Sequence, residues 1–383
     1  MKKSAKRILA LLMVAALAVS ITACGSSNSG SSAAASSAAA TSAAAPAAGA
    51  GTWDGVDVDI QLQCHQSSTE QLSSSYDHMI SLVDQVTDGH VKITAYENGS
   101  LYSVADCLDA VGKGDILMCE ATEASWSDTV PVSMFAAGVP YMFSSYEQAY
   151  MFMYNRGFYD LLNEAYAKVN IHVIPYECYT AGLITKKKIQ SIDDFKGMKL
   201  RASGTMARFE ELLGVAVTQV APNELYNALS QNLIEGVTWG AAQAMVQMNF
   251  QEVCQYYLEE DPIIGQWNSI YVNLDWWNSL TTAQQNELES AIIMAGYHRT
   301  IDTEANNDLT KNGVFADAGV EIVSIDKETR DALAAKGLEL CETLAQADEF
   351  SGRAFEMLKA YIDEWNQGTF VYNNQINFNH KAS

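Results

Sequence analysis

The sequence has few positive charges. Its 383 residues include 23 lysines and arginines against 46 aspartates and glutamates, so the formal net charge is -23. This balance argues against nucleic acid as a partner, because phosphate backbones are bound by clustered cations. Nearly half of the residues are hydrophobic, which excludes disorder of the whole chain. Any site that binds an anion must therefore concentrate a few of the cations.

Common catalytic and metal-binding motifs are also absent. The sequence has no CxxC pair, no HExxH and no GxSxG, so we predict no metal, no cofactor and no enzymatic activity. A lipid-anchored hydrolase is the alternative that these absences disfavour. Six cysteines are scattered along the body and are predicted to be free, mostly buried thiols: Cys64, Cys107, Cys119, Cys178, Cys254 and Cys341.

Long hydrophobic runs are missing beyond residue 24, so no later segment is predicted to span a bilayer. The apolar run at 8–20 follows the basic "MKKSAKR", which is typical of a secretory signal peptide over residues 1–23. The "ITAC" that ends at Cys24 resembles the lipobox of bacterial lipoproteins. It implies a lipid on Cys24 that anchors the protein to the outer face of the cell membrane or in the periplasm. The alternative is an ordinary signal peptide that ends near a cysteine.

Residues 24–52 contain no charge and no aromatic side chain until the folded part begins at Trp53. A segment rich in serine and alanine cannot form a core and is predicted to be a flexible tether. About 28 residues of flexible coil span roughly 30 Å.

The body alternates strand-like and helix-like segments. Period-two apolar positions predict a strand at 56–64, and a helix follows that ends at Gly89. A strand at 90–99, a helix at 103–115 and a buried strand at 116–121 complete a βαβαβ order. This order is typical of an α/β domain with a mostly parallel sheet.

A second alternation of strands and helices follows a helical stretch over 145–168. It restarts near residue 180, which predicts a second α/β domain. Two such domains, joined by more than one crossing of the chain, form a cleft. Ligands of open α/β sheets bind outside the carboxyl ends of strands, so the cleft is the predicted binding site.

Arg201 stands at the carboxyl end of the predicted strand "MKLR", directly before the helix that begins in "ASGTMARFEELLG". Its guanidinium and the helix N-terminus can face one anion together, and the planar fork of arginine suits a carboxylate. The alternative is a surface arginine that pairs with Glu210 or Glu211.

The segments "SIDDFKGMKLRASG" and "LGVAVTQVAPNELYNALSQNLIEGVTWG" resemble the signature region of one family. These are the extracytoplasmic solute receptors of tripartite ATP-independent periplasmic (TRAP) transporters, the DctP-like family. The matching elements are Asp194–Arg201, Leu213-Gly214, Glu224–Leu229 and Glu235-Gly236. "VTDGHVKITAYENGSL", "GVPYMF" and "YVNLDWWNSLTTAQQNELESA" extend the similarity to roughly residues 56–345.

The resemblance implies a fold and partners. The fold is a two-domain α/β periplasmic-binding-protein-like fold with an interdomain cleft and a long hinge-spanning helix at about Thr282 to Asn312. The partners are a small organic acid and the membrane permease that receives it. We expect domain I at 53–178 plus about 265–300, domain II at 179–264 plus about 301–345, and a C-terminal helical segment at 346–383 that packs on the body.

The resemblance also implies site residues. The arginine that matches Arg201 holds the substrate carboxylate in the family, and Trp239 would pack the carbon skeleton of the ligand or else belong to the core. Glu120 or Glu123 could bind a hydroxyl or amine, or be a solvated loop acid. Gln66, Ser67 and Ser68 lie at the predicted cleft edge, or form a plain N-cap cluster. Gln266 and Trp267 are further candidates.

Two departures from the family pattern limit these expectations. Tyr179 to Leu183 offers no second arginine, so a second carboxylate on the ligand has one cation fewer to meet it. Thr238 stands where a metal-binding subgroup has a glutamate, which argues against a bound metal. A receptor for an ABC importer or a sensor is an alternative that uses the same two-domain cleft. The sequence does not say which acid is bound.

Overall fold

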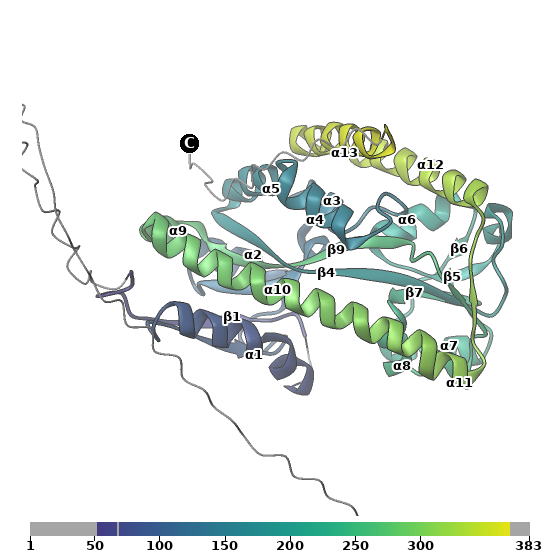
Figure 1. The fold of residues 1–383 in the computed structure, drawn as a ribbon, viewed down its shortest axis with the longest axis horizontal. Coiled ribbons are helices and arrows are strands. Elements are labelled where there is room, and N and C mark those ends of the chain that lie inside the picture. The colour runs from purple at the N-terminus through teal and green to yellow at the C-terminus, as the bar shows by residue number, and fades with distance from the viewer. Residues whose placement is uncertain (1–51, 67–68, 368–383) are drawn as a thin grey trace, which may run out of the picture. The chain divides into compact units, whose positions relative to one another are not determined.

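The structure is a computed structural model that describes residues 52–66 and 69–367. The predicted signal peptide 1–23, Cys24, nearly all of the tether, Ser67 and Ser68 lie outside the described residues. One mixed sheet runs through the described part, with the strand order β2-β1-β3-β9-β4-β7-β5-β6 (Figure 1). The predicted α/β class is therefore confirmed, whereas the domain boundaries stay a prediction.

The first half of the sheet is the predicted βαβαβ unit. β1 pairs in parallel with β2 and with β3. Helix α2 ends at Gly114, whose φ of 80° is a left-handed conformation that glycine adopts without strain. The elements are β1 (Val58–Gln63), α1 (Thr69–Val86), β2 (Val91–Tyr96), α2 (Val104–Lys113) and β3 (Met118–Thr122).

Two long strands connect this half to the second one. β4 (Ile171–Thr185) and β9 (Ile263–Asn273) pair antiparallel along most of their lengths, and β9 is also antiparallel to β3. The expectation of a mostly parallel sheet is wrong at this place, because strands that cross between the halves run in opposite directions. Helices α4 (Tyr146–Asn155) and α5 (Phe158–Tyr166), which lie in the predicted helical stretch at 145–168, flank these strands. So do α3 (Ser133–Ala136) and α9 (Leu274–Ser279), which were not predicted.

In the second half, β5 pairs in parallel with β6 and β7, and β7 pairs antiparallel with β4. β8 pairs antiparallel with the carboxyl end of β4 and in parallel with β10. The elements are β5 (Lys199–Arg201), α6 (Gly204–Leu212), β6 (Ala216–Val217), α7 (Leu225–Ser230), β7 (Gly236–Gly240), α8 (Ala242–Gln247), β8 (Tyr256–Leu258), α11 (Ala316–Ala318) and β10 (Glu321–Val323).

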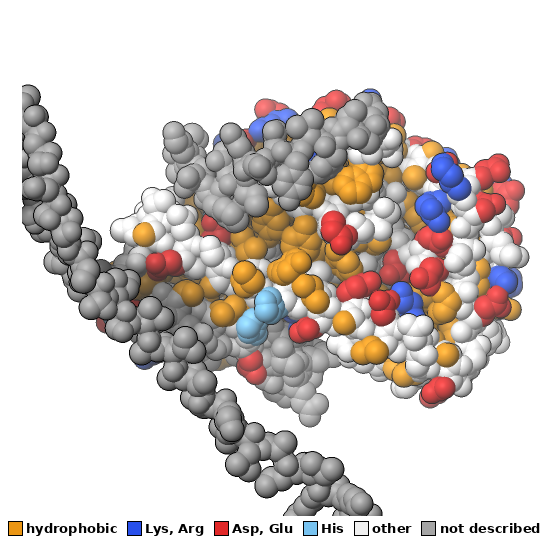
Figure 2. Space-filling model, viewed as in Figure 1, with side chains coloured by type: hydrophobic (Ala, Val, Ile, Leu, Met, Phe, Trp, Pro, Cys, Tyr) orange, Lys and Arg blue, Asp and Glu red, His pale blue; other side chains and the backbone are white. Residues whose placement is uncertain are grey.

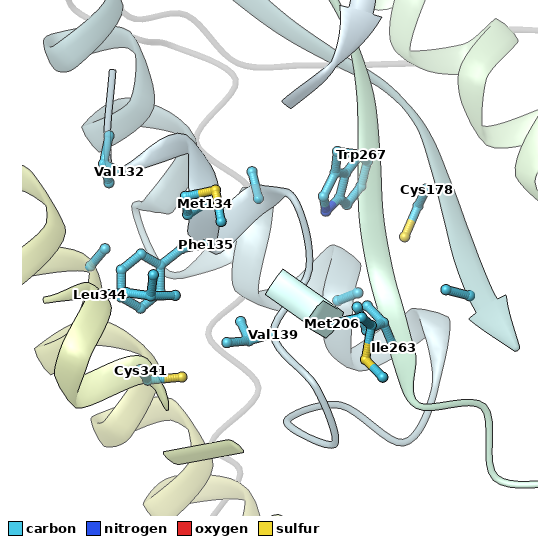
Figure 3. Close-up of a cluster of buried hydrophobic side chains, with 14 of the residues drawn as sticks. Val132, Met134, Phe135, Val139, Cys178, Met206, Ile263, Trp267, Cys341 and Leu344 are labelled. Carbon is cyan, nitrogen blue, oxygen red and sulfur yellow. The ribbon is translucent and has the colours of Figure 1, made fainter. Parts of the chain in front are cut away.

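The core lies on both faces of the sheet. On one face, Val132, Met134 and Phe135 pack toward Cys341 and Leu344 of α12 (Lys327–Leu344), as Figure 3 shows. Helix α13 (Glu349–Gln367) is tied to the body by the ion pairs of Arg353 with Glu164 and of Arg156 with Glu364. All six predicted thiols are buried.

The predicted hinge-spanning helix is observed as α10 (Thr282–Thr310), which runs across both halves of the sheet (Figure 1). It lies directly on β4 because Gly296 has no side chain: a Cβ there would lie 1.6 Å from the carbonyl oxygen of Tyr176. One turn later, the Thr300 hydroxyl accepts a hydrogen bond from the backbone N–H of Cys178 at 3.0 Å. The contact fixes α10 at the point where the chain crosses between the halves.

Gly296→Ala is expected to destabilise the protein by about 2–3 kcal/mol, since the added methyl group forces the helix away from the strand. The matched control is Gly313→Ala, because a Cβ at Gly313 meets nothing within 4 Å. The control should be neutral or stabilising by up to about 1 kcal/mol. Urea denaturation of both variants measures the difference. Equal effects of the two substitutions would contradict the close approach.

Candidate functional site

The carboxyl ends of β3 and β7 point toward each other along β4. Thr122 at the end of β3 pairs with Asn268, which pairs with Glu177 of β4, and Gly240 at the end of β7 pairs with Ala181. The two ends are thus separated by about four residues of β4, or roughly 13 Å. Because ligands bind outside the carboxyl ends of strands, this gap is the expected place for a ligand.

A cavity of about 570 Å³ occupies this gap. Gln66 and His78 line it from the first half, and Gln243 and Gln247 of α8 line it from the second. Residues of β4 and of α10 line it between the two halves. Figure 2 shows the face of the protein on which α10 lies, where histidine side chains are exposed near acidic ones. The cavity therefore contacts both halves, as a cleft that closes on its ligand requires.

Arg201 lies at the carboxyl end of β5 and is only partly exposed. Its guanidinium is 4.8 Å from the ring centroid of Trp239, and its Nη1 donates a long hydrogen bond of 3.4 Å to the carbonyl oxygen of Thr238. Its Nε is buried and has no hydrogen-bond partner among the described residues. Burial lowers the pKa of Arg201, and the neighbouring Glu210 opposes that effect. The structure thus places Arg201 and Trp239 together and leaves Nε of the guanidinium without a partner among the described residues. Neither is among the described residues that line the cavity, although Gly240, which follows Trp239, does line it.

Glu210 lies behind Arg201 on α6 and is fully buried. Its Oε1 accepts a hydrogen bond of 2.6 Å from the hydroxyl of Thr238, whereas its Oε2 has no partner in the described part of the chain. Burial raises its pKa to about 7, although Thr238 and Arg201 both act in the opposite direction. No ion pair joins Arg201 to Glu210 or Glu211 within the described residues. The alternative of a paired surface arginine is not what the structure has.

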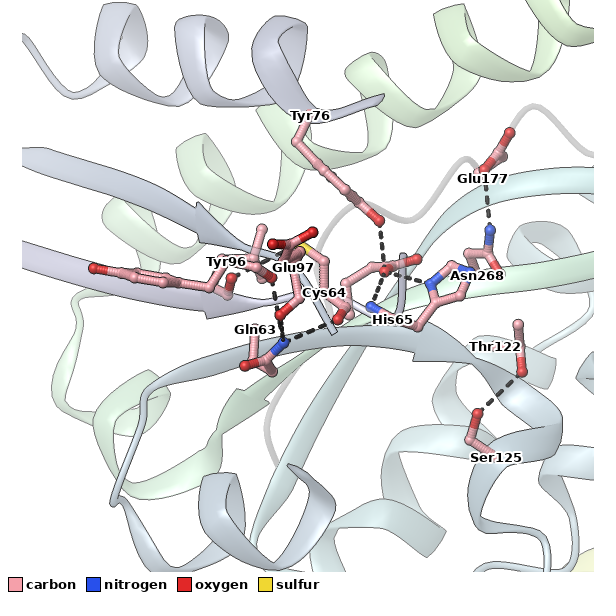
Figure 4. Close-up of polar contacts among 12 residues, drawn as sticks. Gln63, Cys64, His65, Tyr76, Tyr96, Glu97, Thr122, Ser125, Glu177 and Asn268 are labelled. Carbon is pink, nitrogen blue, oxygen red and sulfur yellow. Dashed lines mark hydrogen bonds and ion pairs between the residues drawn. The ribbon is translucent and has the colours of Figure 1, made fainter. Parts of the chain in front are cut away.

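Glu120 is buried inside β3 and is held by two residues from other elements. Its Oε2 accepts hydrogen bonds of 2.6 Å from the hydroxyl of Tyr76 and contacts Nδ1 of His65, also at 2.6 Å (Figure 4). Burial acts to raise the pKa of Glu120, but His65 and Tyr76 together hold it below its usual value. Glu120 therefore positions the His65–Gln66 segment at the cleft, and it is not a solvated loop acid.

Glu123, Gln266 and Trp267 make contacts inside the protein and, like Arg201 and Trp239, are not among the described residues that line the cavity. The carboxyl group of Glu123 is buried, accepts hydrogen bonds from the hydroxyls of Ser269 and Tyr166, and has its pKa raised to about 7 by burial. Trp267 is 2% exposed and packs edge-on against Tyr150 in the core. Gln266 donates a hydrogen bond to the carbonyl oxygen of Ala137. We therefore do not carry Glu123, Gln266 or Trp267 into the proposed site.

The sequence analysis missed an ion pair in the cavity. Nε of Arg299 on α10 lies 2.9 Å from Oε2 of Glu177 on β4, and both residues line the cavity. The two residues are far apart in the sequence, and neither stands in a motif. The one hint was the expected hinge-spanning helix. A helix that spans both domains has to pass the cleft between them, so α10 could have been expected to line it.

Two further features concern membranes and metals. Among the described residues, no helix has both the length and the apolar composition that a membrane span needs. In the same residues, no group of three or more histidine, cysteine, aspartate or glutamate side chains is arranged to hold a metal ion. Thr238, at the position of the subgroup's metal-ligating glutamate, instead donates to Glu210.

Comparisons with known proteins agree with this geometry. The chain is 26% identical over 295 residues to the monocarboxylate 2-oxoacid-binding periplasmic protein of Nostoc, covering 74% of this chain and 79% of the relative. The fold matches a TRAP periplasmic solute-binding protein from Colwellia psychrerythraea, solved with bound calcium and pyruvate. That match has a TM-score of 0.72 and 22% identity, over 82% of this chain and 96% of the other.

A TRAP transporter solute-binding protein from Bordetella bronchiseptica, solved with calcium and picolinate, matches with a TM-score of 0.71 and 22% identity. This match covers 83% of this chain and 96% of the other. The family model of DctP, described as bacterial extracellular solute-binding protein, family 7, matches residues 64–348. This match covers most of the chain and confirms the resemblance on which the site residues were predicted. The chain belongs to the DctP family of bacterial extracellular solute-binding proteins.

Proposed function

We propose that this protein is the solute receptor of a TRAP transporter and captures a small organic acid through Arg201. The observation that carries the proposal is the state of the Arg201 guanidinium, which is partly buried, has an Nε without a hydrogen-bond partner and has no carboxylate partner in the described part of the chain. A carboxylate from a ligand would supply the missing hydrogen bonds and charge. The relatives named above bind carboxylates, which supports this assignment.

Trp239 supports the same assignment, because its ring contacts the guanidinium of Arg201. Its ring lies under Arg201 and is only partly buried, so an apolar surface remains beside the cation. The carbon skeleton of a carboxylate held by Arg201 can pack on this surface. Gln66 follows His65, which Glu120 holds, and it lines the cavity, so it is a candidate to bind the polar groups of the ligand.

Ligand-driven closure follows from contacts on two walls. A ligand that contacts Arg201 on one side and the first half on the other stabilises only the closed state, so binding raises the closed population. The closed form is then recognised by the membrane permease. Family membership makes the protein extracytoplasmic, and we propose that a lipid on Cys24 holds it at the membrane surface through the 24–52 tether.

Arg201→Ala is expected to weaken the binding of small monocarboxylates by about 2–5 kcal/mol, because the ligand carboxylate loses its charged partner in a desolvated site. Arg208→Ala is the matched control: Arg208 is exposed on α6 and its loss changes the net charge equally. Isothermal titration calorimetry against a panel of acids and their uncharged analogues measures both. A loss below tenfold in Arg201→Ala would refute the role of Arg201.

The affinity for the acid is expected to fall as pH rises through 7. The pKa of Glu210 is about 7 in the free protein, and a bound carboxylate beside it raises that pKa further. Binding therefore takes up a proton, and it is favoured at pH 6 over pH 8. Glu210→Gln should remove this dependence, whereas Glu211→Gln, which is exposed, should keep it. A wild-type affinity that stays constant between pH 6 and pH 8 would contradict the coupling.

A further inference from the structure

Arg299 brings a second guanidinium to the cleft, but its charge is already paired. Its partner Glu177 is 5% exposed, and both carboxylate oxygens of Glu177 are engaged. Oε2 accepts from Arg299 at 2.9 Å and from the amide of Asn268 at 3.0 Å, and Oε1 accepts from the hydroxyl of Thr303 at 3.3 Å. The residues that hold the pair come from β4, β9 and α10, so its geometry is fixed by the crossing itself.

This pairing decides the charge of the cavity. Among the described residues that line it, Arg299 is the only lysine or arginine, whereas Glu177 and Asp302 are both acidic. A carboxylate placed against this wall would lose water without gaining a free cation, and it would face two carboxylates. The wall therefore repels a second negative charge on the ligand.

The rest of the wall suits uncharged polar groups. Thr180, Gln243, Gln247, Asn268 and Asn306 present hydroxyls and side-chain amides to the cavity. Such groups can both donate and accept hydrogen bonds, as ligand hydroxyls and carbonyl oxygens require. The cavity thus offers a ligand mostly uncharged hydrogen-bonding groups next to one paired guanidinium.

We propose that Glu177 determines the specificity of the site. It cancels the charge of Arg299, so the cleft accepts acids with a single carboxylate and hydroxyl or keto groups on the remaining carbons, and rejects dicarboxylates. This inference rests on the proposed function, in which Arg201 holds the one carboxylate. Glu177 and Arg299 line the cavity, and neither contacts Arg201 in any hydrogen bond or ion pair of the described residues.

The test compares acids that share a carbon skeleton but differ in the number of carboxylates. Suitable pairs are gluconate with glucarate, and pentanoate and hexanoate with glutarate and adipate. Calorimetric titration of the purified protein at pH 8, where histidine is generally uncharged, should give at least tenfold weaker binding of each dicarboxylate. The panel spans several lengths so that a second carboxylate can reach Arg299.

Glu177→Gln keeps the shape of the side chain and leaves Arg299 with an unpaired charge. We expect it to gain at least tenfold in affinity for one or more dicarboxylates, while monocarboxylate affinity changes less than threefold. The matched control is the double variant Glu177→Gln with Arg299→Gln, which makes the pair neutral again and should lose the gain. Thermal melting of each variant verifies that it is folded.

The outcomes separate this inference from the proposed function. Equal binding of paired acids by the wild type overturns the specificity role, and so does a folded Glu177→Gln variant without a dicarboxylate gain. A wild type that binds no acid, or acid binding that survives in Arg201→Ala, refutes the proposed function instead. If Glu177→Gln does not fold, the Arg299→Gln variant is the test. It leaves the negative charge of Glu177 without its partner, so the affinity for every acid should fall at least threefold. An unchanged affinity would overturn the inference.

Discussion

The unpaired guanidinium of Arg201 is the constraint around which the site is built. An arginine with buried donors and no carboxylate partner among the described residues is costly for the free protein. Its position fits a site that gains the missing interactions when a ligand binds. In the proposed function, Trp239 and Glu210 beside Arg201 favour an anion with an apolar stem, whose binding is coupled to a proton near neutral pH.

The crossing of the chain brings the two halves of the sheet to one cavity. β4 and β9 hold the carboxyl ends of β3 and β7 opposite each other, and α10 lies against β4 because Gly296 allows it. The same contact region carries the pair of Glu177 and Arg299, which lines the cavity. In our proposal, structure and specificity are thus coupled, since the strand that links the two halves also carries the carboxylate that selects the ligand.

Local sequence patterns predicted the elements well and the long-range polar contacts poorly. Local apolar patterns located β1, β2 and β3 because apolar faces repeat within a few residues, and the family resemblance located α10. The resemblance also singled out Arg201 and Trp239, which the structure places in contact. It could not reveal the antiparallel crossing, the burial of Glu120 under Tyr76 and His65, or the pairing of Glu177 with Arg299, because each depends on residues far apart in the sequence. Trp267 was proposed from its position before a strand and lies in the core.

The most direct test of the account is the width of the cleft with and without an acid. Spin labels on cysteines introduced at Asp77 of α1 and Gln247 of α8 report this distance, because both positions are exposed and the six native cysteines of the described region are buried. We predict that a saturating monocarboxylate shortens the distance between labels in the wild type and leaves it unchanged in Arg201→Ala. A distance that does not respond to any acid, or that shortens equally in both proteins, would contradict carboxylate capture by closure.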